Sequence, residues 1–101
     1  MAFSVLLLRN MVSPGEIDTE LENEVAVECS QYGRVQQVLL HEYFDRQFAR
    51  PEVNVFVVFP DAGLTAVQAA VSNLHGRYFA GRRISAQAYD PAAFFARQLE
   101  G

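Results

Sequence analysis

The chain contains 101 residues, of which 50% are hydrophobic and 20% are charged, and its formal net charge at pH 7 is −4. These values predict one compact domain over residues 1–101, and they argue against a general nucleic-acid binder, which normally presents a basic surface. No run of residues approaches the roughly 20 apolar positions of a membrane span, and the first residues lack the pattern of a signal peptide.

The first third of the chain predicts a strand followed by a helix. Residues 3–9 form a short apolar run, which is typical of a buried central strand. Ser13 and Pro14 form a helix-start signal, because serine caps free amides and proline suits the first turn. An amphipathic helix over residues 16–31 is predicted because apolar side chains then recur every four positions. These side chains are Ile17, Leu21, Val25 and Cys29.

Two further strands and a second helix are predicted in the middle of the chain. Residues 35–41 are apolar at four of seven positions and residues 53–59 are rich in valine and phenylalanine, so both predict strands. Residues 43–51 have no clear period and predict a loop. Asp61 is suited to cap a helix that ends at Gly76, since glycine readily takes the left-handed conformation. One face of this helix is apolar: Leu64, Val67, Ala70, Val71 and Leu74.

The connection after the second helix carries an unusual group of side chains. Gly81 suits a tight turn before the next strand. Ahead of it come Arg77, Tyr78 and Phe79, on a segment that must lie at the surface. A connection does not need two aromatic rings for its own stability. Either one ring fills the core or one is offered to a partner.

The order of the predicted elements defines the fold class. Residues 83–89 predict a fourth strand, and Asp90 with the following proline begins a third helix over residues 92–99. The order strand, helix, strand, strand, helix, strand is the split βαβ, ferredoxin-like arrangement of an α+β fold. We expect a four-stranded antiparallel sheet with two helices on one face. The other face is either free or covered by the C-terminal helix, which carries Phe94 and Phe95.

This topology is that of the RNA recognition motif (RRM), whose central strands stack bases on aromatic side chains. Residues 52–59 align with the motif Lys/Arg-Gly-Phe/Tyr-Gly/Ala-Phe-Val-x-Phe/Tyr, but Glu52 replaces the basic residue and Asn54 the first stacking aromatic. On the first strand, Leu7 replaces the aromatic of the companion motif. Phe56 remains, and each lost stack removes roughly 1–3 kcal/mol. Single-stranded RNA binding through Phe56 is therefore the alternative interpretation.

The acidic residues are concentrated in one part of the chain. Six of the twelve lie between Glu16 and Glu28. Glu20, Glu24 and Glu28 are four positions apart and form one stripe about 12 Å long on the first helix. All eight cations are arginine, and none lies in this helix. The stripe is either a solvated surface, with Arg77 able to cap it, or a binding surface for a basic partner.

The other reactive side chains predict no catalytic, metal or cofactor site. Cys29 follows the apolar spacing of the first helix, so we expect a small buried side chain in a reducing compartment. His41 and His75 have no cysteine or carboxylate cluster at ligand spacing. No phosphate-binding glycine loop or nucleophile motif is visible. We therefore expect a protein without enzymatic activity and without a cofactor.

Four segments carry a resemblance to a known family: residues 6–12 (Leu-Leu-Leu-Arg-Asn-Met-Val), 14–18 (Pro-Gly-Glu-Ile-Asp), 28–33 (Glu-Cys-x-x-Tyr-Gly) and 76–82 (Gly-Arg-Tyr-Phe-Ala-Gly-Arg). The chain resembles the UHM domains, RRM-like modules of auxiliary factors in 3′ splice-site recognition. Their hallmark is Arg-x-Phe in this connection, together with an acidic first helix and degenerate RNA motifs. The similarity covers nearly all of residues 5–95, and the chain most resembles the splicing-factor-45 class.

The resemblance implies a pocket for the tryptophan of a short basic peptide, called a UHM ligand motif. Phe79 would stack on the indole ring, and Arg77 would pair with a helix carboxylate, first of all Glu24, to form a wall. The acidic stripe would receive the basic residues that precede the tryptophan. Tyr78 would shape the connection or contact the edge of the peptide.

The resemblance also implies a nuclear domain that acts in pre-mRNA splicing, with peptides of splicing factors as its partners. RNA binding is expected to be weak or absent, and no membrane partner is expected. Some UHM domains self-associate, so a homodimer is a further alternative. Some proteins of this class are named for DNA repair, and they usually carry the domain after a glycine-rich G-patch, so the chain is expected to be one part of a longer protein.

Overall fold

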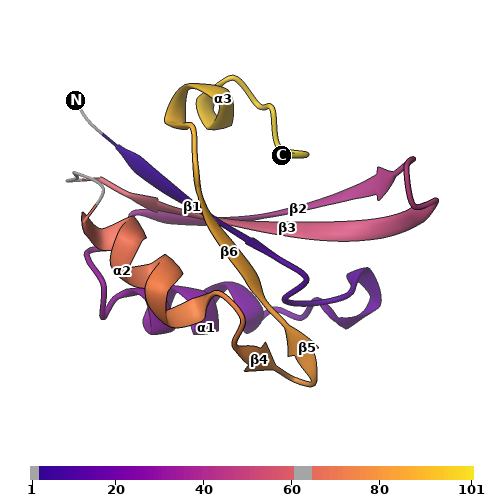
Figure 1. Ribbon diagram of the computed structural model, residues 1–101, viewed down its shortest axis with the longest axis horizontal. Coiled ribbons are helices and arrows are strands. Elements are labelled where there is room, and N and C mark those ends of the chain that lie inside the picture. The colour runs from indigo at the N-terminus through magenta and orange to yellow at the C-terminus, as the bar shows by residue number, and fades with distance from the viewer. Residues whose placement is uncertain (1–2, 61–64) are drawn as a thin grey trace.

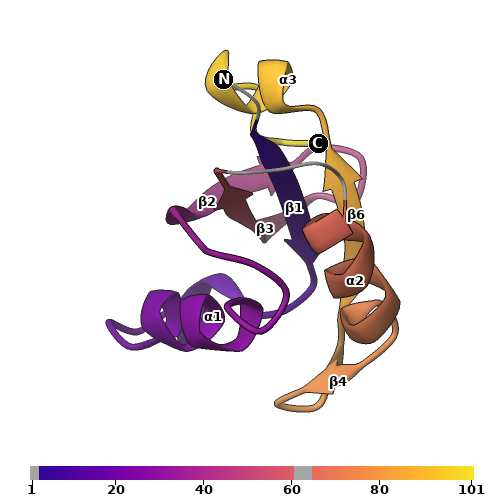
Figure 2. The same cartoon turned by 90° about the vertical axis from the view of Figure 1, so that its left-hand side faces the viewer.

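The computed structural model describes residues 3–60 and 65–101 and has the predicted RRM-like α+β fold. The strands are β1 (Ser4–Arg9), β2 (Gln37–Asp45), β3 (Arg50–Phe59), β4 (Tyr78–Phe79), β5 (Arg82–Arg83) and β6 (Ser85–Tyr89). The helices are η1 (Pro14–Glu16), α1 (Leu21–Cys29), α2 (Thr65–Leu74) and α3 (Pro91–Phe95). Antiparallel pairing gives the sheet order β2-β3-β1-β6, with α1 and α2 on one face and α3 on the other (Figures 1 and 2).

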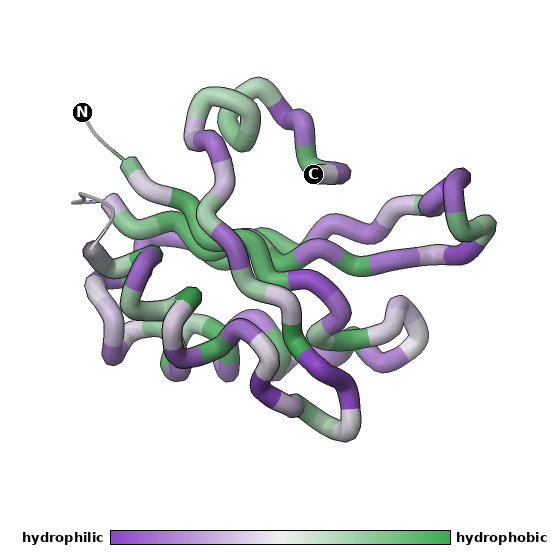
Figure 3. The backbone as a smooth tube through the Cα atoms, viewed as in Figure 1, coloured by the Kyte–Doolittle hydropathy of each residue, from purple (hydrophilic) through white to green (hydrophobic). Residues whose placement is uncertain are grey.

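The central strands β1 and β3 are buried on both faces because each face is covered. The larger core lies between the sheet and the helices α1 and α2, and it includes Leu6, Leu8, Val55 and Val57. The smaller core lies under α3 and consists of Val5, Leu7, Phe56, Val58, Phe94 and Leu99. Figure 3 shows the hydrophobic residues gathered along the middle of the strands. No helix within the described ranges is long and apolar enough to cross a membrane.

The first helix is shorter than the predicted range of residues 16–31. The short 3₁₀ turn η1 precedes it, and Ser13 makes no capping hydrogen bond. Asp18 provides the cap instead, since its Oδ1 accepts hydrogen bonds of 2.9 Å from the amides of Glu20 and Leu21. These two amides bind the Asp18 side chain instead of the backbone carbonyls of a preceding helical turn. The regular α-helix therefore begins at Leu21.

The predicted loop over residues 43–51 is wrong. β2 continues to Asp45 and β3 begins at Arg50, so the two strands form one long hairpin (Figure 1). The turn is closed by Asp45, whose Oδ1 accepts a 2.9 Å hydrogen bond from the amide of Gln47, and Ala49 has a φ of 51°. The hairpin extends beyond the core, and exposed aromatic side chains such as Phe44 and Phe48 are mixed there with charged ones. This mixture has no clear period, so the pattern did not reveal a strand. The strands on either side of the predicted loop are therefore longer than expected.

The third helix is also shorter than predicted over residues 92–99. Its start agrees with the prediction, because the Asp90 side chain accepts a 3.0 Å hydrogen bond from the amide of Ala92. Arg97 has a φ of 64°, and an α-helix cannot continue through this left-handed conformation. After α3, Leu99 is buried in the smaller core against the sheet.

Phe56, the predicted platform for RNA, is completely buried by this C-terminal segment. Its ring centroid lies 5.4 Å from that of Phe94 and 5.1 Å from that of Tyr89. The neighbouring Asn54 donates a 3.0 Å hydrogen bond from Nδ2 to the carbonyl of Leu99. The sequence did not decide whether the face opposite α1 and α2 is free or covered by the C-terminal helix. In the structure this face is covered over β1 and β3.

The second helix ends as predicted, and its beginning lies outside the described residues. Leu74 is its last residue, and Gly76 follows with a φ of 84°. Val67, Ala70 and Leu74 are buried, which agrees with the predicted apolar face. The predicted cap Asp61 and the predicted core residue Leu64 both fall within residues 61–64, which the structure does not describe.

Cys29 is buried in the larger core, as predicted. Burial, and to a smaller extent the neighbouring charge of Glu28, raise the pKa of the Cys29 thiol to about 12. Since the thiolate is the reactive form, we expect iodoacetamide at pH 8 to label the native protein at least about a hundredfold more slowly than the urea-unfolded protein. Comparable rates, measured by mass spectrometry, would show that α1 opens readily.

Candidate peptide-binding site

The Arg-Tyr-Phe segment lies on a small hairpin beyond the end of α2. β4 pairs with β5 in a separate two-stranded sheet, and Gly81, with a φ of 82°, lies in the predicted turn. Two backbone hydrogen bonds close the base: the amide of Gly76 donates to the carbonyl of Ile84 at 2.8 Å, and the amide of Ile84 donates to that of Arg77 at 2.7 Å. The predicted fourth strand is shortened to β6 because Arg83 belongs to this hairpin.

Asn10 fixes the hairpin to the end of β1. Its backbone has a φ of 62°, which is uncommon for a residue other than glycine. Its Nδ2 donates a 3.0 Å hydrogen bond to the carbonyl of Arg83. Its Oδ1 and carbonyl oxygen accept hydrogen bonds from Nη2 and Nε of Arg82, at 2.6 and 3.2 Å. Three hydrogen bonds thus hold the hairpin that carries Phe79.

A cavity of about 200 Å³ lies between α1 and this hairpin, and we call it the hairpin cavity. Its floor consists of buried apolar side chains: Met11, Val25, Leu74 and Ile84. Its rim consists of polar and aromatic side chains: Glu24, Glu28, Arg77, Tyr78 and Phe79. Cavities for drug-sized ligands usually measure about 300–1,000 Å³. The hairpin cavity therefore suits one large side chain rather than a whole small molecule.

Arg77 forms an ion pair with Glu28, and the predicted pairing with Glu24 is wrong. The distance from Nη1 of Arg77 to Oε2 of Glu28 is 3.6 Å. Because residues four apart on a helix are rotated by about 40°, the acidic stripe winds around α1 and its last member reaches the hairpin. Gln31 also donates a 2.5 Å hydrogen bond from Nε2 to this carboxylate. The exposed pair contributes about 0–1 kcal/mol to stability, so its main effect is to shape the cavity wall.

The rest of the acidic stripe divides between the cavity and solvent. Glu24 lines the hairpin cavity, and its carboxylate has no hydrogen bond or ion pair with any residue in the described ranges. Glu20 is exposed, precedes the first residue of α1 and does not line the cavity. The structure thus brings together five of the six residues predicted for peptide binding and leaves Glu20 apart.

The two rings of the hairpin have different environments. Tyr78 is 71% exposed, at the rim of the cavity. Phe79 is half-buried and packs against the larger core while it also lines the cavity. Phe79 thus combines the two roles that the sequence left open for an aromatic ring of this connection. Part of the ring contacts the core, and part of it is available to a ligand in the cavity.

Sequence reasoning missed a second, smaller cavity of about 180 Å³ beside Phe79. Its lining includes three charged residues that the sequence did not assign to the site: Glu16, Asp18 and Arg82. The sequence placed Glu16 and Asp18 in the first helix, but the helix begins later, at Leu21. The Pro-Gly-Glu-Ile-Asp segment was the available signal, because it is one of the segments that carry the family resemblance.

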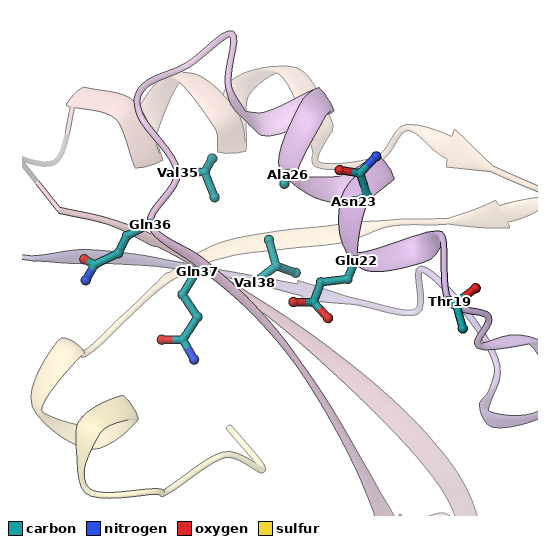
Figure 4. A pocket seen from close by; sticks show the side chains of 8 residues that line it. All are labelled: Thr19, Glu22, Asn23, Ala26, Val35, Gln36, Gln37 and Val38. Carbon is teal, nitrogen blue, oxygen red and sulfur yellow. The ribbon is translucent and has the colours of Figure 1, made fainter.

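Two larger hollows elsewhere are more open to solvent. One of about 420 Å³ lies between the other flank of α1 and the edge strand β2 (Figure 4). It is lined by Thr19, Glu22, Asn23, Ala26, Val35, Gln36, Gln37 and Val38. The other, of about 820 Å³, lies beside Arg9 and the stacked rings of His41 and Tyr43. The hairpin cavity differs from both in its enclosed, apolar floor.

Comparison with curated proteins gives relatives named for splicing and for DNA repair, although no protein-family model matches the chain. The chain is 46% identical over 96 residues to DNA-damage-repair/toleration protein 111 of Arabidopsis thaliana. It is 40% identical over 93 residues to poly(U)-binding-splicing factor PUF60 of Homo sapiens. These alignments cover 94% and 90% of the chain but 24% and 16% of the relatives, so the chain spans a quarter or less of their length.

Solved structures with the same fold are RRM domains. The Rna15 RRM with bound RNA (GU) has a TM-score of 0.61 at 23% identity, over 93% of this chain and 94% of that chain. RNA recognition domains 1 and 2 of Sex-lethal from Drosophila melanogaster have a TM-score of 0.63 at 14% identity, over 90% of this chain and 52% of that chain. Such low identities show the fold alone. Together with the 40% identity to PUF60, this fold shows that the chain is an RRM-like domain related to part of PUF60.

Proposed function

We propose that this domain binds a short basic peptide whose tryptophan fills the hairpin cavity. The observation that carries the proposal is the cavity itself. Its apolar floor lies beside the half-buried ring of Phe79 and the carboxylate of Glu24, which has no partner in the part of the chain that the structure describes. An apolar floor suits an aromatic side chain, and an unpaired carboxylate suits a cation next to it.

Each wall of the cavity has a role in this proposal. Phe79 stacks on the indole ring, which adds about 0.5–1.5 kcal/mol beyond the area buried. The ion pair between Arg77 and Glu28 forms part of the polar rim of the cavity. Glu24 receives a basic side chain of the peptide, and the exposed Tyr78 contacts the peptide edge. A buried aromatic anchor with a charged rim is the usual arrangement of a binding hot spot.

The names of the relatives suggest the setting. Because PUF60 is named a splicing factor, we infer that the partner peptides belong to splicing factors and that the domain acts in the nucleus, by binding and not by catalysis. A role in DNA repair, suggested by the name of the Arabidopsis relative, would belong to the whole protein. Self-association into a homodimer stays a prediction.

Single-stranded RNA binding on the sheet face is the second candidate, because one solved structure of the Rna15 RRM contains bound RNA. The burial of Phe56 beneath Phe94 makes it the weaker one. A base can stack on Phe56 only after α3 leaves the sheet.

The test is a calorimetric titration with an arginine-rich peptide containing one tryptophan, with its tryptophan-to-alanine version, and with a single-stranded RNA. We expect the tryptophan peptide to bind, the alanine peptide to bind at least about 30-fold more weakly, and the RNA to bind weakly or not at all. RNA binding without any tryptophan-dependent peptide binding would refute the proposal.

A further inference from the structure

The strand β2 lies at one edge of the sheet, since the strand order is β2-β3-β1-β6 and only β3 pairs with it in residues 3–60 and 65–101. An edge strand presents a row of backbone amides and carbonyls that have no partner in the sheet. Proteins usually protect such an edge with lysine, proline or a very short strand. β2 is nine residues long and contains neither lysine nor proline. Its edge is therefore open to a further strand.

The register shows which residues of β2 face the open edge. The amide of Gln36 donates a 2.8 Å hydrogen bond to the carbonyl of Val58, so this carbonyl points toward β2. Opposite residues of an antiparallel pair alternate between hydrogen-bonded and non-hydrogen-bonded, and Gln37 lies opposite Val58. Pro51, which has no amide hydrogen, lies opposite Phe44 and agrees with this alternation. The backbone groups at the open edge are therefore those of every second residue: Val38, Leu40, Glu42 and Phe44.

The hollow of about 420 Å³ lies beside this edge, on the face of the sheet that α1 covers (Figure 4). Its floor is apolar, because Val38 is buried and Ala26 and Val35 pack against the larger core. In Figure 4 these three side chains lie between α1 and β2. Successive side chains of a strand point to opposite faces of a sheet. A strand added to β2 would therefore place every second side chain on the side of this floor.

The charges around the hollow favour a basic strand. Glu22 lines the hollow, and its carboxylate has no hydrogen bond or ion pair with any residue in the described ranges. None of the described cations lines it. Glu42 is exposed and lies four residues beyond Val38, on the same face of β2. Opposite charges across two strands stabilise their pairing, whereas like charges destabilise it.

The same charges disfavour a second copy of this chain at the open edge. The chain has a net charge of −4, and pairing of β2 with β2 would bring two edges that both carry Glu22 and Glu42 together. A segment of a different protein that carries lysine or arginine has the complementary charge.

We propose that β2 binds an extended basic segment of another protein, which pairs with it as an antiparallel fifth strand. In this pairing a β-branched apolar side chain lies opposite Val38 and enters the hollow, and a lysine or arginine lies opposite Glu42. Because the strands are antiparallel, the basic residue precedes the apolar one by four positions. Main-chain hydrogen bonds provide affinity in such strand addition, and the hollow provides specificity.

This inference does not rest on the proposed function. The hollow and the hairpin cavity share no lining residue, because they lie on different flanks of α1. Strand addition at β2 therefore leaves the hairpin cavity free for its own ligand.

The probe for the test is the end-blocked peptide Thr-Lys-Thr-Val-Thr-Val-Thr, whose lysine lies opposite Glu42 and whose second valine lies opposite Val38 in the proposed pairing. It is titrated into the ¹⁵N-labelled protein and followed by NMR. We expect a Kd of about 1 mM or tighter. The largest shifts, together with slower hydrogen exchange, are expected at the amides that face the open edge: Val38, Leu40, Glu42 and Phe44.

N-methylation of the peptide separates strand pairing from side-chain contact. Methyl groups on the two valine amides, which face β2 in the proposed pairing, are expected to weaken binding at least about tenfold. Methyl groups on the two threonines that flank the first valine point away from β2 and are expected to change the affinity by less than about threefold. Equal affinity of the two methylated peptides overturns the proposal.

A charge exchange tests the role of Glu42. The peptide with glutamate in place of lysine is expected to bind the original protein about three- to tenfold more weakly, and to regain this affinity with the variant Glu42→Lys. Recovery of binding also shows that the variant is folded. A preference for lysine that survives in Glu42→Lys overturns the assigned position of the basic residue.

Two further outcomes overturn the proposal as a whole. One is the absence of shifts along β2 at peptide concentrations up to about 2 mM, twice the expected Kd. The other is a shift of the same amides with protein concentration alone, accompanied by slower diffusion, which would show that a second copy occupies the edge.

Discussion

Replacement of Phe79 by alanine is expected to weaken binding of a tryptophan peptide by about 30-fold or more, the loss that defines a hot spot. The change removes the ring that would stack on the indole, and it merges the two cavities that this ring borders. Calorimetric titration of Phe79→Ala with the arginine-rich tryptophan peptide measures the effect.

The matched control is Tyr78→Ala in the same hairpin. Tyr78 is mostly exposed and packs against neither core, so we expect at most a few-fold change in affinity and no loss of stability. If Phe79→Ala binds as well as the original protein, or if the two variants lose the same affinity, the ring is not the anchor of the site.

Replacement of Phe94 by alanine is expected to lower the free energy of unfolding by about 3–5 kcal/mol, the usual cost of emptying a buried phenylalanine site. Phe94 is 2% exposed, and its ring lies 5.4 Å from that of Phe56. Urea unfolding followed by circular dichroism measures the change. The control Phe95→Ala removes a neighbouring ring that is half-exposed, so its cost is expected to be clearly smaller.

This second experiment also bears on the choice between peptide and RNA. A cost below about 1 kcal/mol for Phe94→Ala would mean that α3 is not packed firmly on the sheet. Phe56 would then be accessible, and RNA binding by base stacking on the sheet face would become the favoured function. A large cost supports the account in which this face is permanently covered.

The fold could be predicted from the sequence because its main elements carry strong local signals. The apolar run of β1, the apolar face of α2 and the glycines at positions 76 and 81 all indicated the correct element. The predictions were wrong where two local signals compete or where the local signal is weak. Asp18 displaced Ser13 as the helix cap, and the end of the β2–β3 hairpin lies outside the core, where no apolar pattern is required.

The site was predictable only in part, for a similar reason. Arg77, Tyr78 and Phe79 are consecutive, and the acidic stripe has a simple period, so both could be recognised along the chain. The hydrogen bonds between Asn10 and Arg82 join residues 72 positions apart, so no local sequence pattern predicts them. The choice of Glu28 over Glu24 depends on the winding of the stripe around α1, which a fixed spacing of four does not show.

The most direct test of the peptide site is chemical-shift mapping of the ¹⁵N-labelled protein with the tryptophan peptide. We predict the largest shifts at the amides of Arg77, Tyr78 and Phe79 and along α1 from Glu24 to Glu28, with the sheet face unchanged. If the shifts instead concentrate around Tyr43, Phe56 and Phe94, the peptide binds the sheet face and the hairpin cavity is not its site.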